Sequence, residues 1–280
     1  MKTAIVTDST AYLTPEEQSR FNIKVIPLAV NLAGEVFDET AITPSAFYDK
    51  VRANKDFPKT TQPSIGRFVE LFEALKQQGF EEVVSIHLSS GISGTYQGAL
   101  QAGEMVDGIT VQAFDSEISC AVQGYYVLKA GEMAANGASA QTIIEALDAM
   151  KPSVNAYFVV DDLAHLQRGG RLSAAAAIIG GLLQVKPVLH FVDKVIVPFE
   201  KIRTRKKAVK RAEEMMANAI ASGANEVVVI QGNCLEEAER LKNEFAQKYP
   251  QVNFKISYFG PVIGTHLGEG SIGIGWCEMK

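Results

Sequence analysis

A short apolar run followed at once by a turn rich in serine and glycine is the feature that most restricts the fold of this chain. The run is Val83–Ile86, and the turn reads H-L-S-S-G-I-S-G-T-Y from His87 to Tyr96. Short runs rich in β-branched residues are typical of buried parallel strands, and such a turn leads into a helix. The helix N–H groups and the turn hydroxyls suit an anionic ligand. A turn in which Ser90 or Ser93 merely caps the helix fits this pattern equally well.

Further strand-like runs alternate with helical segments on both sides of this turn. Strands are predicted over Thr3–Thr7, Val25–Val30 and Ile109–Phe114, and helices from Thr14, from Thr43, and over Ile65–Gln78, Ser119–Asn136 and Ala140–Met150. Strands that alternate with helices at this spacing predict a parallel sheet covered on both faces. The fold class is therefore α/β.

The pattern changes near Lys151–Ser153, and a length of 280 residues exceeds the usual size of one domain. We therefore expect an N-terminal α/β domain over 1–152 and a C-terminal α/β domain over 153–280, with a soft boundary. The segment 57–78 packs either with the first domain or with the second. The second domain should contain a mixed or antiparallel sheet, because Lys186–Phe191 and Val195–Phe199 are patterned as a hairpin. Its other predicted strands are Ala156–Val160, Glu226–Gln231, Asn253–Phe259 and Ile272–Trp276.

Charge and cysteine content exclude several classes of protein. A formal net charge of −5 argues against a general nucleic-acid binder. The three cysteines are widely spaced and predict neither a disulfide framework nor a metal site. The longest apolar run, Ala174–Leu183, has about half the ~20 residues needed to span a bilayer. We expect a soluble, cytoplasmic protein without cofactor or metal.

Several polar or glycine-rich segments have both a structural and a functional interpretation. The loop Phe57–Ser64 holds Thr60 and Thr61 between two prolines. It either points these hydroxyls toward a ligand or is an ordinary linker before the next helix. The turn Arg168–Arg171, R-G-G-R, either binds a phosphate or carboxylate or, as we favour, pairs with Asp161 or Asp162. The run Ala174–Leu183 contains Gly180 and Gly181 and is either a packed helix or a gate.

Five segments together resemble the DegV family, which includes the fatty-acid-binding subunits of bacterial fatty acid kinase. They are T-D-S-T at 7–10, T-T-Q-P-S at 60–64, the turn at 87–96, R-G-G-R at 168–171, and G-P-V-I-G-T-H-L-G at 260–268. The resemblance covers essentially the whole chain in order. One departure is Thr61, which stands where members of this family commonly have Ser.

The resemblance implies a carrier rather than an enzyme. The carboxylate of a long-chain fatty acid would bind Thr60 or Thr61 together with Ser93 and the neighbouring Gly94, and His266 would orient it. Ser90 and Thr265 would support these residues. The acyl chain would lie in an apolar tunnel between the two domains. An ionised carboxylate only accepts hydrogen bonds, so a site built of donors agrees with this reading.

The resemblance also implies a partner, a separate ATP-dependent kinase subunit that converts the carboxylate to an acyl phosphate for phospholipid synthesis. Arg203 and Arg205 of the basic run 201–211 are the implied docking residues, although such a run is usually a solvated helix face. The chain itself has no Walker-type loop. A transient membrane contact would accompany ligand loading, and no nucleic acid is expected.

Two other functions compete with the carrier. In a serine hydrolase, Ser93 would be the nucleophile and His266 the base, but G-I-S-G lacks the G-x-S-x-G elbow and no third residue is identifiable. In a phosphate-binding, kinase-like domain, the same Ser/Gly turn would hold a phosphate. An apolar cavity beside the donors would distinguish the carrier from both.

Overall fold

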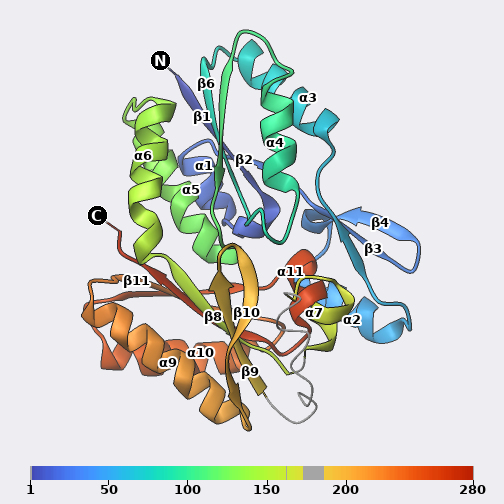
Figure 1. The fold of residues 1–280 in the computed structure, drawn as a ribbon, viewed down its shortest axis with the longest axis vertical. Helices are drawn as coiled ribbons and strands as arrows, with labels where there is room; N and C mark the ends of the chain where they lie inside the picture. Colours follow the sequence, from blue (N-terminus) through green and yellow to red (C-terminus); the bar gives the residue numbers. More distant parts are fainter. Residues whose placement is uncertain (1, 162, 173–185, 280) are drawn as a thin grey trace.

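The structure is a computed structural model that describes residues 2–161, 163–172 and 186–279 (Figure 1). Its first layer is a sheet of four parallel strands. In spatial order these are β2 (Lys24–Ile26), β1 (Thr3–Asp8), β6 (Glu82–His87) and β7 (Thr110–Asp115). The predicted parallel sheet is therefore confirmed, with the Ser/Gly turn at the carboxyl end of one of its two central strands.

Helices cover both faces of this sheet. Helices α3 (Ile65–Gln77) and α4 (Thr95–Gly103) lie on one face, and α5 (Cys120–Ala135) and α6 (Ala140–Met150) lie on the other (Figure 1). Successive side chains of β1 alternate between these layers, because strand side chains point to opposite faces. Val6 packs with Phe68 and Phe72 of α3, whereas Ile5 belongs to the core that contains α5.

The second sheet is mixed, as the sequence predicts. Its spatial order is β10 (Val195–Ile202), β9 (Lys186–Val192), β8 (Asn155–Val159), β13 (Ile272–Cys277), β11 (Glu226–Gln231) and β12 (Asn253–Tyr258). Only β11 and β12 pair in parallel, and all other pairs are antiparallel. Helices α9 (Arg205–Ala221) and α10 (Leu235–Lys248) cover one of its faces.

Helix α5 joins the two halves of the molecule. It packs under β1 and β6 and also against β13, so that both sheets contribute to one hydrophobic core. The contact with β13 is close: a Cβ atom added to Gly275 would lie 2.2 Å from a methyl group of Val122. The chain passes from α6 to β8 through η3 (Lys151–Ser153), where the sequence places the boundary. Because the core continues across it, the division into 1–152 and 153–280 stays a proposal.

The predicted strand Val25–Val30 is instead two strands in different sheets. Pro27 cannot donate a backbone hydrogen bond, and the chain leaves the first sheet there after β2. It continues as β3 (Ala29–Leu32), which pairs antiparallel with β4 (Glu35–Asp38) and with β5 (Lys59–Thr61). Segment 57–78 is thereby divided: α3 packs on the first sheet, and β5 contacts α11 (Pro261–Leu267).

Short helices complete the described part of the chain. They are η1 (Ser9–Ala11), α1 (Pro15–Arg20), η2 (Glu39–Ala41), α2 (Pro44–Ala53) and α7 (Ala164–Arg168). None of the helices in the described ranges has the length and apolar character needed to cross a membrane. Those ranges also contain no group of three or more His, Cys, Asp or Glu arranged to hold a metal ion.

Candidate functional site

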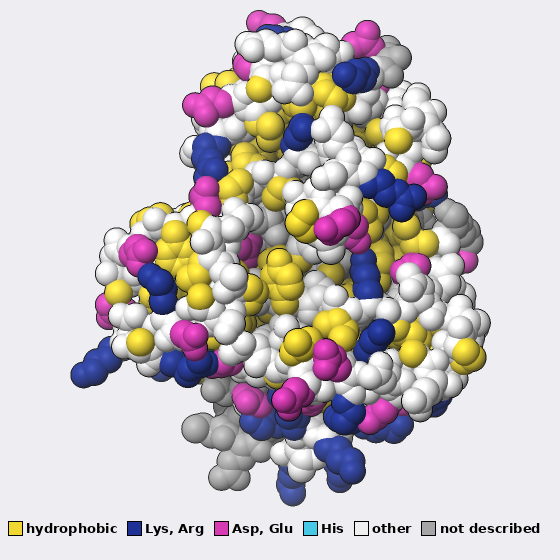
Figure 2. Space-filling view, turned by 180° about the vertical axis from the view of Figure 1, so that it is seen from behind, with side chains coloured by type: hydrophobic (Ala, Val, Ile, Leu, Met, Phe, Trp, Pro, Cys, Tyr) yellow, Lys and Arg dark blue, Asp and Glu magenta, His cyan; other side chains and the backbone are white. Residues whose placement is uncertain are grey.

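Four of the predicted motif segments meet around one small cavity of about 260 Å³. It lies where the turn after β6 and strand β5 of the first half face helix α11 and the R-G-G-R turn of the second half. The space-filling view shows hydrophobic side chains gathered in a hollow between the upper and lower parts of the molecule (Figure 2). The cavity is lined by Leu28, Thr60, Thr61, Gln62, Leu88, Ile92, Ser93, Arg171, Val262, Ile263 and His266.

Thr60 and His266 form a hydrogen-bonded pair at this cavity, although they lie far apart in the sequence. Oγ1 of Thr60 is 2.9 Å from Nε2 of His266. The imidazole is 8% exposed, and its Nδ1 has no hydrogen-bond partner among the described residues. This nitrogen faces Gly169, where a Cβ atom would lie only 2.2 Å away. The backbone at Gly169 can approach the ring so closely only because glycine has no side chain.

The surroundings of His266 keep it neutral at ordinary pH. Burial, followed by the positive charge of Arg171, lowers the pKa of this imidazole to about 3. A neutral imidazole that donates through Nε2 to Thr60 leaves the hydroxyl proton of Thr60 free. Thr60 can then donate to an acceptor placed in the cavity.

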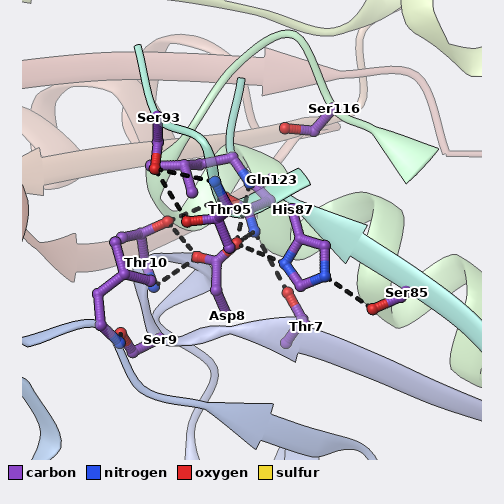
Figure 3. Close-up of polar contacts among 12 residues, drawn as sticks. Thr7, Asp8, Ser9, Thr10, Ser85, His87, Ser93, Thr95, Ser116 and Gln123 are labelled. Carbon is purple, nitrogen blue, oxygen red and sulfur yellow. Dashed lines mark hydrogen bonds and ion pairs between the residues drawn. The ribbon is translucent and has the colours of Figure 1, made fainter. Parts of the chain in front are cut away.

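Ser93 lines the cavity and also bonds to Thr95, the first residue of α4. Its Oγ lies 2.9 Å from Oγ1 of Thr95 and accepts a 3.3 Å hydrogen bond from the backbone N–H of Thr95 (Figure 3). Gly94 is the N-cap residue of α4 and does not line the cavity. A Cβ atom at Gly94 would lie 2.3 Å from Oε1 of Gln62, so glycine is needed for Gln62 to pack there. Thr61 is exposed and lines the cavity beside Thr60.

The two residues expected to support the ligand face other parts of the structure. Ser90 points to Asp115, with a 2.5 Å bond from its Oγ and a 3.1 Å bond from its N–H. Thr265 donates from Oγ1 to the carbonyl of Pro261 within α11, at 2.8 Å. Neither side chain lines the cavity. They can act on the site only by stabilising the turn and the helix that present its other residues.

Arg171 does not pair with Asp161, one of the two partners that the sequence suggested for this turn. Its predicted partner Asp161 instead pairs with Lys186 at 2.9 Å and with Arg205 at 3.3 Å, and Asp162 lies outside the described residues. Arg171 donates from Nε to the carbonyl of Ile92 and from Nη1 to the carbonyl of Gly169. Within the described ranges no carboxylate pairs with its guanidinium, which therefore presents a positive charge at the cavity. The other alternative that the sequence left open, binding of a phosphate or carboxylate at this turn, stays a prediction, and of the two arginines only Arg171 is among the described residues that line the cavity.

The T-D-S-T motif forms a second polar cluster, which we call the Asp8 cluster: Thr7, Asp8, Thr10, Ser85, His87 and Gln123, all completely buried (Figure 3). Oδ2 of Asp8 accepts hydrogen bonds from His87 Nδ1 at 3.0 Å and from the N–H of Leu88 at 2.9 Å. Its Oδ1 accepts from Thr10. Burial alone would raise the pKa of Asp8, but the hydrogen bonds, above all from His87, lower it. The cluster fixes the carboxyl ends of β1 and β6 next to the Ser/Gly turn.

The geometry of the two clusters argues against a serine hydrolase. Ser93 is bonded to Thr95 and His266 to Thr60, so the predicted nucleophile and base do not form a pair. Ser85, His87 and Asp8 do follow one another at hydrogen-bond distance, with 2.7 Å between Ser85 Oγ and His87 Nε2. That hydroxyl is fully buried, however, and no substrate could reach it.

The two predicted docking residues differ from each other. Arg205 is engaged in the fold: it pairs with Glu237 at 2.8 Å and with Asp161, and it donates to the carbonyl of Gly270. These bonds give Arg205 a structural role, and its assignment to partner docking stays a prediction. Arg203 is exposed between β10 and α9, and no hydrogen bond or ion pair links it to the described residues. The predicted gate, Ala174–Leu183, lies outside the described residues.

Comparisons with known proteins cover the whole chain. Residues 2–279 match the family model described as "Uncharacterised protein, DegV family". Protein DegV of Bacillus subtilis is 53% identical over 280 residues, 99% of each chain. A DegV domain-containing protein of Listeria innocua is 51% identical over 277 residues, 98% of each chain.

Solved structures agree with these sequence matches. The crystal structure of DegV from Bacillus subtilis, described as a fatty acid binding protein, superposes with a TM-score of 0.94 at 52% identity. A DegV family protein from Thermus thermophilus, also described by its fatty acid binding, gives a TM-score of 0.91 at 29% identity. Both comparisons cover 100% of each chain.

Proposed function

Because this chain belongs to the DegV family, we propose that it is a carrier that binds a long-chain fatty acid and presents the carboxylate to a separate kinase subunit. The observation that carries the proposal is the composition of the cavity. The described residues that line it combine hydroxyls and a guanidinium with the aliphatic side chains of Leu28, Leu88, Ile92, Val262 and Ile263, and none of them carries a carboxylate. A fatty acid combines the same two chemistries in one molecule.

The polar wall suits a carboxylate because it offers donors. Thr60 can donate once Nε2 of His266 donates to its oxygen, and Ser93 offers a second hydroxyl from the turn. Arg171 supplies the compensating positive charge. Hydrogen bonds to an ionised acceptor are worth roughly 1.5–3 kcal/mol each, about twice the value for neutral pairs.

The apolar wall supports binding of the acyl chain. Each methylene removed from water contributes roughly 0.8 kcal/mol, so a long chain supplies most of the affinity. The cavity lies between the two halves of the molecule, and its apolar side belongs to the core that both sheets share. We propose that the acyl tunnel runs along this junction. DegV proteins from Bacillus subtilis and Thermus thermophilus are described as fatty acid binding, which supports the assignment.

In the proposed reaction the carrier supplies the substrate and the partner supplies the chemistry. A carboxylate oxygen attacks the γ-phosphorus of ATP held by the kinase subunit, the bond to the β-phosphate oxygen breaks, and acyl phosphate and ADP result. Arg203 is exposed and unpaired within the described ranges, and we assign it to the docking of the kinase subunit. The carrier would work in the cytoplasm and exchange its ligand during brief contact with the membrane, and the acyl phosphate would enter phospholipid synthesis.

The proposal is tested by extracting the protein purified from cells and identifying the bound small molecules by mass spectrometry. We expect a long-chain fatty acid in the wild-type extract and far less in Ser93→Ala. Ser90→Ala is the matched control. It removes a hydroxyl from the same turn, but this hydroxyl points to Asp115 and not into the cavity. An empty wild-type protein that also fails to take up added fatty acid would refute the carrier function.

A further inference from the structure

Glu39 is a buried carboxyl group that the proposed function does not use. It begins the one-turn helix η2 after β4 and is 4% exposed. Within the described ranges no Lys, Arg or His forms an ion pair with it. A carboxylate without a counter-ion is costly to bury unless several donors satisfy it. Its contacts therefore indicate what it does.

Three donors from two segments, η1 with its C-cap residue and the first turn of α11, converge on this carboxyl group. Oε1 accepts hydrogen bonds from the hydroxyl of Tyr12 and from the backbone N–H of Val262, both at 2.9 Å. Oε2 accepts from Oγ of Ser9 at 2.5 Å. Ser9 Oγ in turn accepts from the N–H of Leu28 at 3.1 Å, and the N–H of Glu39 donates to the Leu28 carbonyl at 2.8 Å. One side chain thus links the end of β1, the Leu28 segment and α11.

For α11, Glu39 acts as the missing N-terminal cap. The N-cap residue is Gly260, which has no side chain to satisfy the first N–H groups, and Pro261 has no N–H. A Cβ atom at Gly260 would lie 2.8 Å from Oε1 of Glu39 and 2.6 Å from the ring of Tyr12. The glycine therefore makes room for a cap that comes from a distant part of the chain.

The two segments held by Glu39, the Leu28 segment and α11, form walls of the small cavity around Thr60, Ser93, Arg171 and His266, which we call the head-group cavity. Leu28 lines it directly, and α11 contributes Val262, Ile263 and His266. The carboxyl group itself faces away, into a neighbouring cavity of about 380 Å³ that Ser9 and Tyr12 also line. Glu39 is thus behind the wall that a bound anion would touch, and the second cavity gives water access to it.

We propose that Glu39 is a positioning residue for the head-group cavity and that its protonation is coupled to the binding of an anion there. Ionised Glu39 and a bound carboxylate would lie on opposite sides of the first turn of α11, and their like charges would repel. Binding of the anion therefore favours the protonated form of Glu39 and takes up a proton. This inference rests on the proposed function only in requiring that the ligand is an anion.

Both protonation states fit the geometry. Ionised Glu39 accepts from all three donors, whereas protonated Glu39 can donate from Oε2 to Ser9 Oγ and still accept from Tyr12 and Val262 at Oε1. Burial raises the pKa of Glu39 to about 7, so both forms are populated near neutral pH. Affinity for an anion is then expected to fall as pH rises through about 7, because more of the protein carries the repelling charge.

The other ionisable groups around Glu39 do not change charge near neutral pH. Burial raises the pKa of Tyr12, Tyr48 and Tyr258, and it raises the pKa of the Cys120 thiol to about 12. The pKa of Asp8 is lowered, and that of His266 is lowered to about 3. A change in anion affinity between about pH 6 and about pH 8.5 that depends on residue 39 would therefore report Glu39 itself.

The test uses hexadecyl sulfonate, whose head group stays anionic over this range, and hexadecanol as the uncharged analogue. Titration calorimetry of the wild type should show sulfonate affinity falling roughly three- to tenfold from about pH 6 to about pH 8.5, which corresponds to a like-charge repulsion of about 0.6–1.4 kcal/mol. Hexadecanol affinity should stay constant. Glu39→Gln imitates the protonated form and should bind sulfonate without this pH dependence, at close to the low-pH wild-type affinity.

The matched control is Glu35→Gln, because this carboxylate lies on β4 just before Glu39, is 62% exposed and pairs with Lys50. It should keep the wild-type pH profile. Identical profiles for wild type and Glu39→Gln, or equal pH dependence for sulfonate and hexadecanol, would overturn the proposal. If Glu39→Gln fails to fold, the comparison of the two probes in the wild type still decides. Failure of every probe to bind at any pH would instead refute the carrier function.

Discussion

The Asp8 cluster and the head-group cavity are both built from polar residues of the motif segments, yet their hydrogen bonds differ in kind. Asp8 accepts from four different residues, and its partners bond to one another without contact with solvent. At the cavity, by contrast, neither the hydroxyl proton of Thr60 nor the positive charge of Arg171 has a carboxylate partner within the described ranges. Buried polar groups are normally satisfied, so these donors indicate a missing acceptor. The first cluster is complete without a ligand, and the second is not.

The largest effect that this comparison predicts is on stability, at Asp8. Asp8→Ala leaves the buried donors of His87, Leu88 and Thr10 without an acceptor, and we expect a loss of roughly 3–5 kcal/mol in the free energy of unfolding. Urea denaturation followed by circular dichroism measures it. Asp38→Ala is the control, because this partly exposed residue pairs only with Arg67 and should cost about 1 kcal/mol or less. A stable Asp8→Ala protein that has lost its ligand would reverse the roles of the two clusters.

The second prediction is that the cavity and the Asp8 cluster change the stability of the protein in different pH ranges. The folded pKa of His266 is lowered to about 3 against 6.5 for a free imidazole. Below about pH 6.5 the unfolded chain takes up a proton that the folded chain does not, so stability falls as pH falls. At 1.36 kcal/mol per pH unit, the loss between pH 6.5 and about pH 4.5 is roughly 2–3 kcal/mol. Asp8 has a lowered folded pKa, so its contribution is lost only as pH falls below about 3.8.

Thermal unfolding of wild type and His266→Gln across this range tests the assignment. The variant should lose less stability than the wild type from about pH 6.5 downward, and the two curves should become parallel only below about pH 3, the folded pKa of His266. Added fatty acid should reduce the wild-type loss, because a carboxylate beside the imidazole raises its pKa again. Identical curves for the two proteins would show that His266 titrates normally and that the cavity is wetter than the structure indicates.

The third prediction concerns Arg171 and affects binding rather than stability. Arg171→Gln should weaken fatty acid binding roughly ten- to hundredfold, the equivalent of one charge-assisted interaction of about 1.5–3 kcal/mol. The free energy of unfolding should change less than in Asp8→Ala, because the substitution removes hydrogen bonds to the carbonyls of Ile92 and Gly169 but, within the described ranges, no ion pair. Arg168→Gln is the matched control, since Arg168 belongs to the same turn but lies over the ring of Phe57. Equal loss of affinity in both variants would mean that the charge of the turn matters and not the position of Arg171.

These comparisons also show how far the sequence could predict the site. Periodicity was sufficient for the parallel sheet, its helices and the mixed second sheet, because burial on two faces leaves a strong local pattern. It could not tell Ser90 from Ser93, since the backbone angles of a turn decide which hydroxyl faces the cavity. The partners of Arg171 and Arg205 were also out of reach. They depend on Ile92, Gly169, Glu237 and Gly270, which the fold brings together from separate segments.

The smallest expected effect lies outside both clusters, at Arg203. Its exposed side chain contacts neither the cavity nor the Asp8 cluster, so Arg203→Ala should leave fatty acid affinity and stability unchanged and slow only phosphoryl transfer by the proposed kinase partner. Charge steering predicts a decrease of a few fold that shrinks as salt is added, because exposed charges are screened beyond a Debye length of ~8 Å at physiological ionic strength. Lys207→Ala removes another exposed charge of the same basic run and is the matched control.

If both variants slow the reaction equally, the run acts through its total charge. If neither does, the run is a solvated helix face, and if Arg203→Ala also loses fatty acid, the residue belongs to the ligand site.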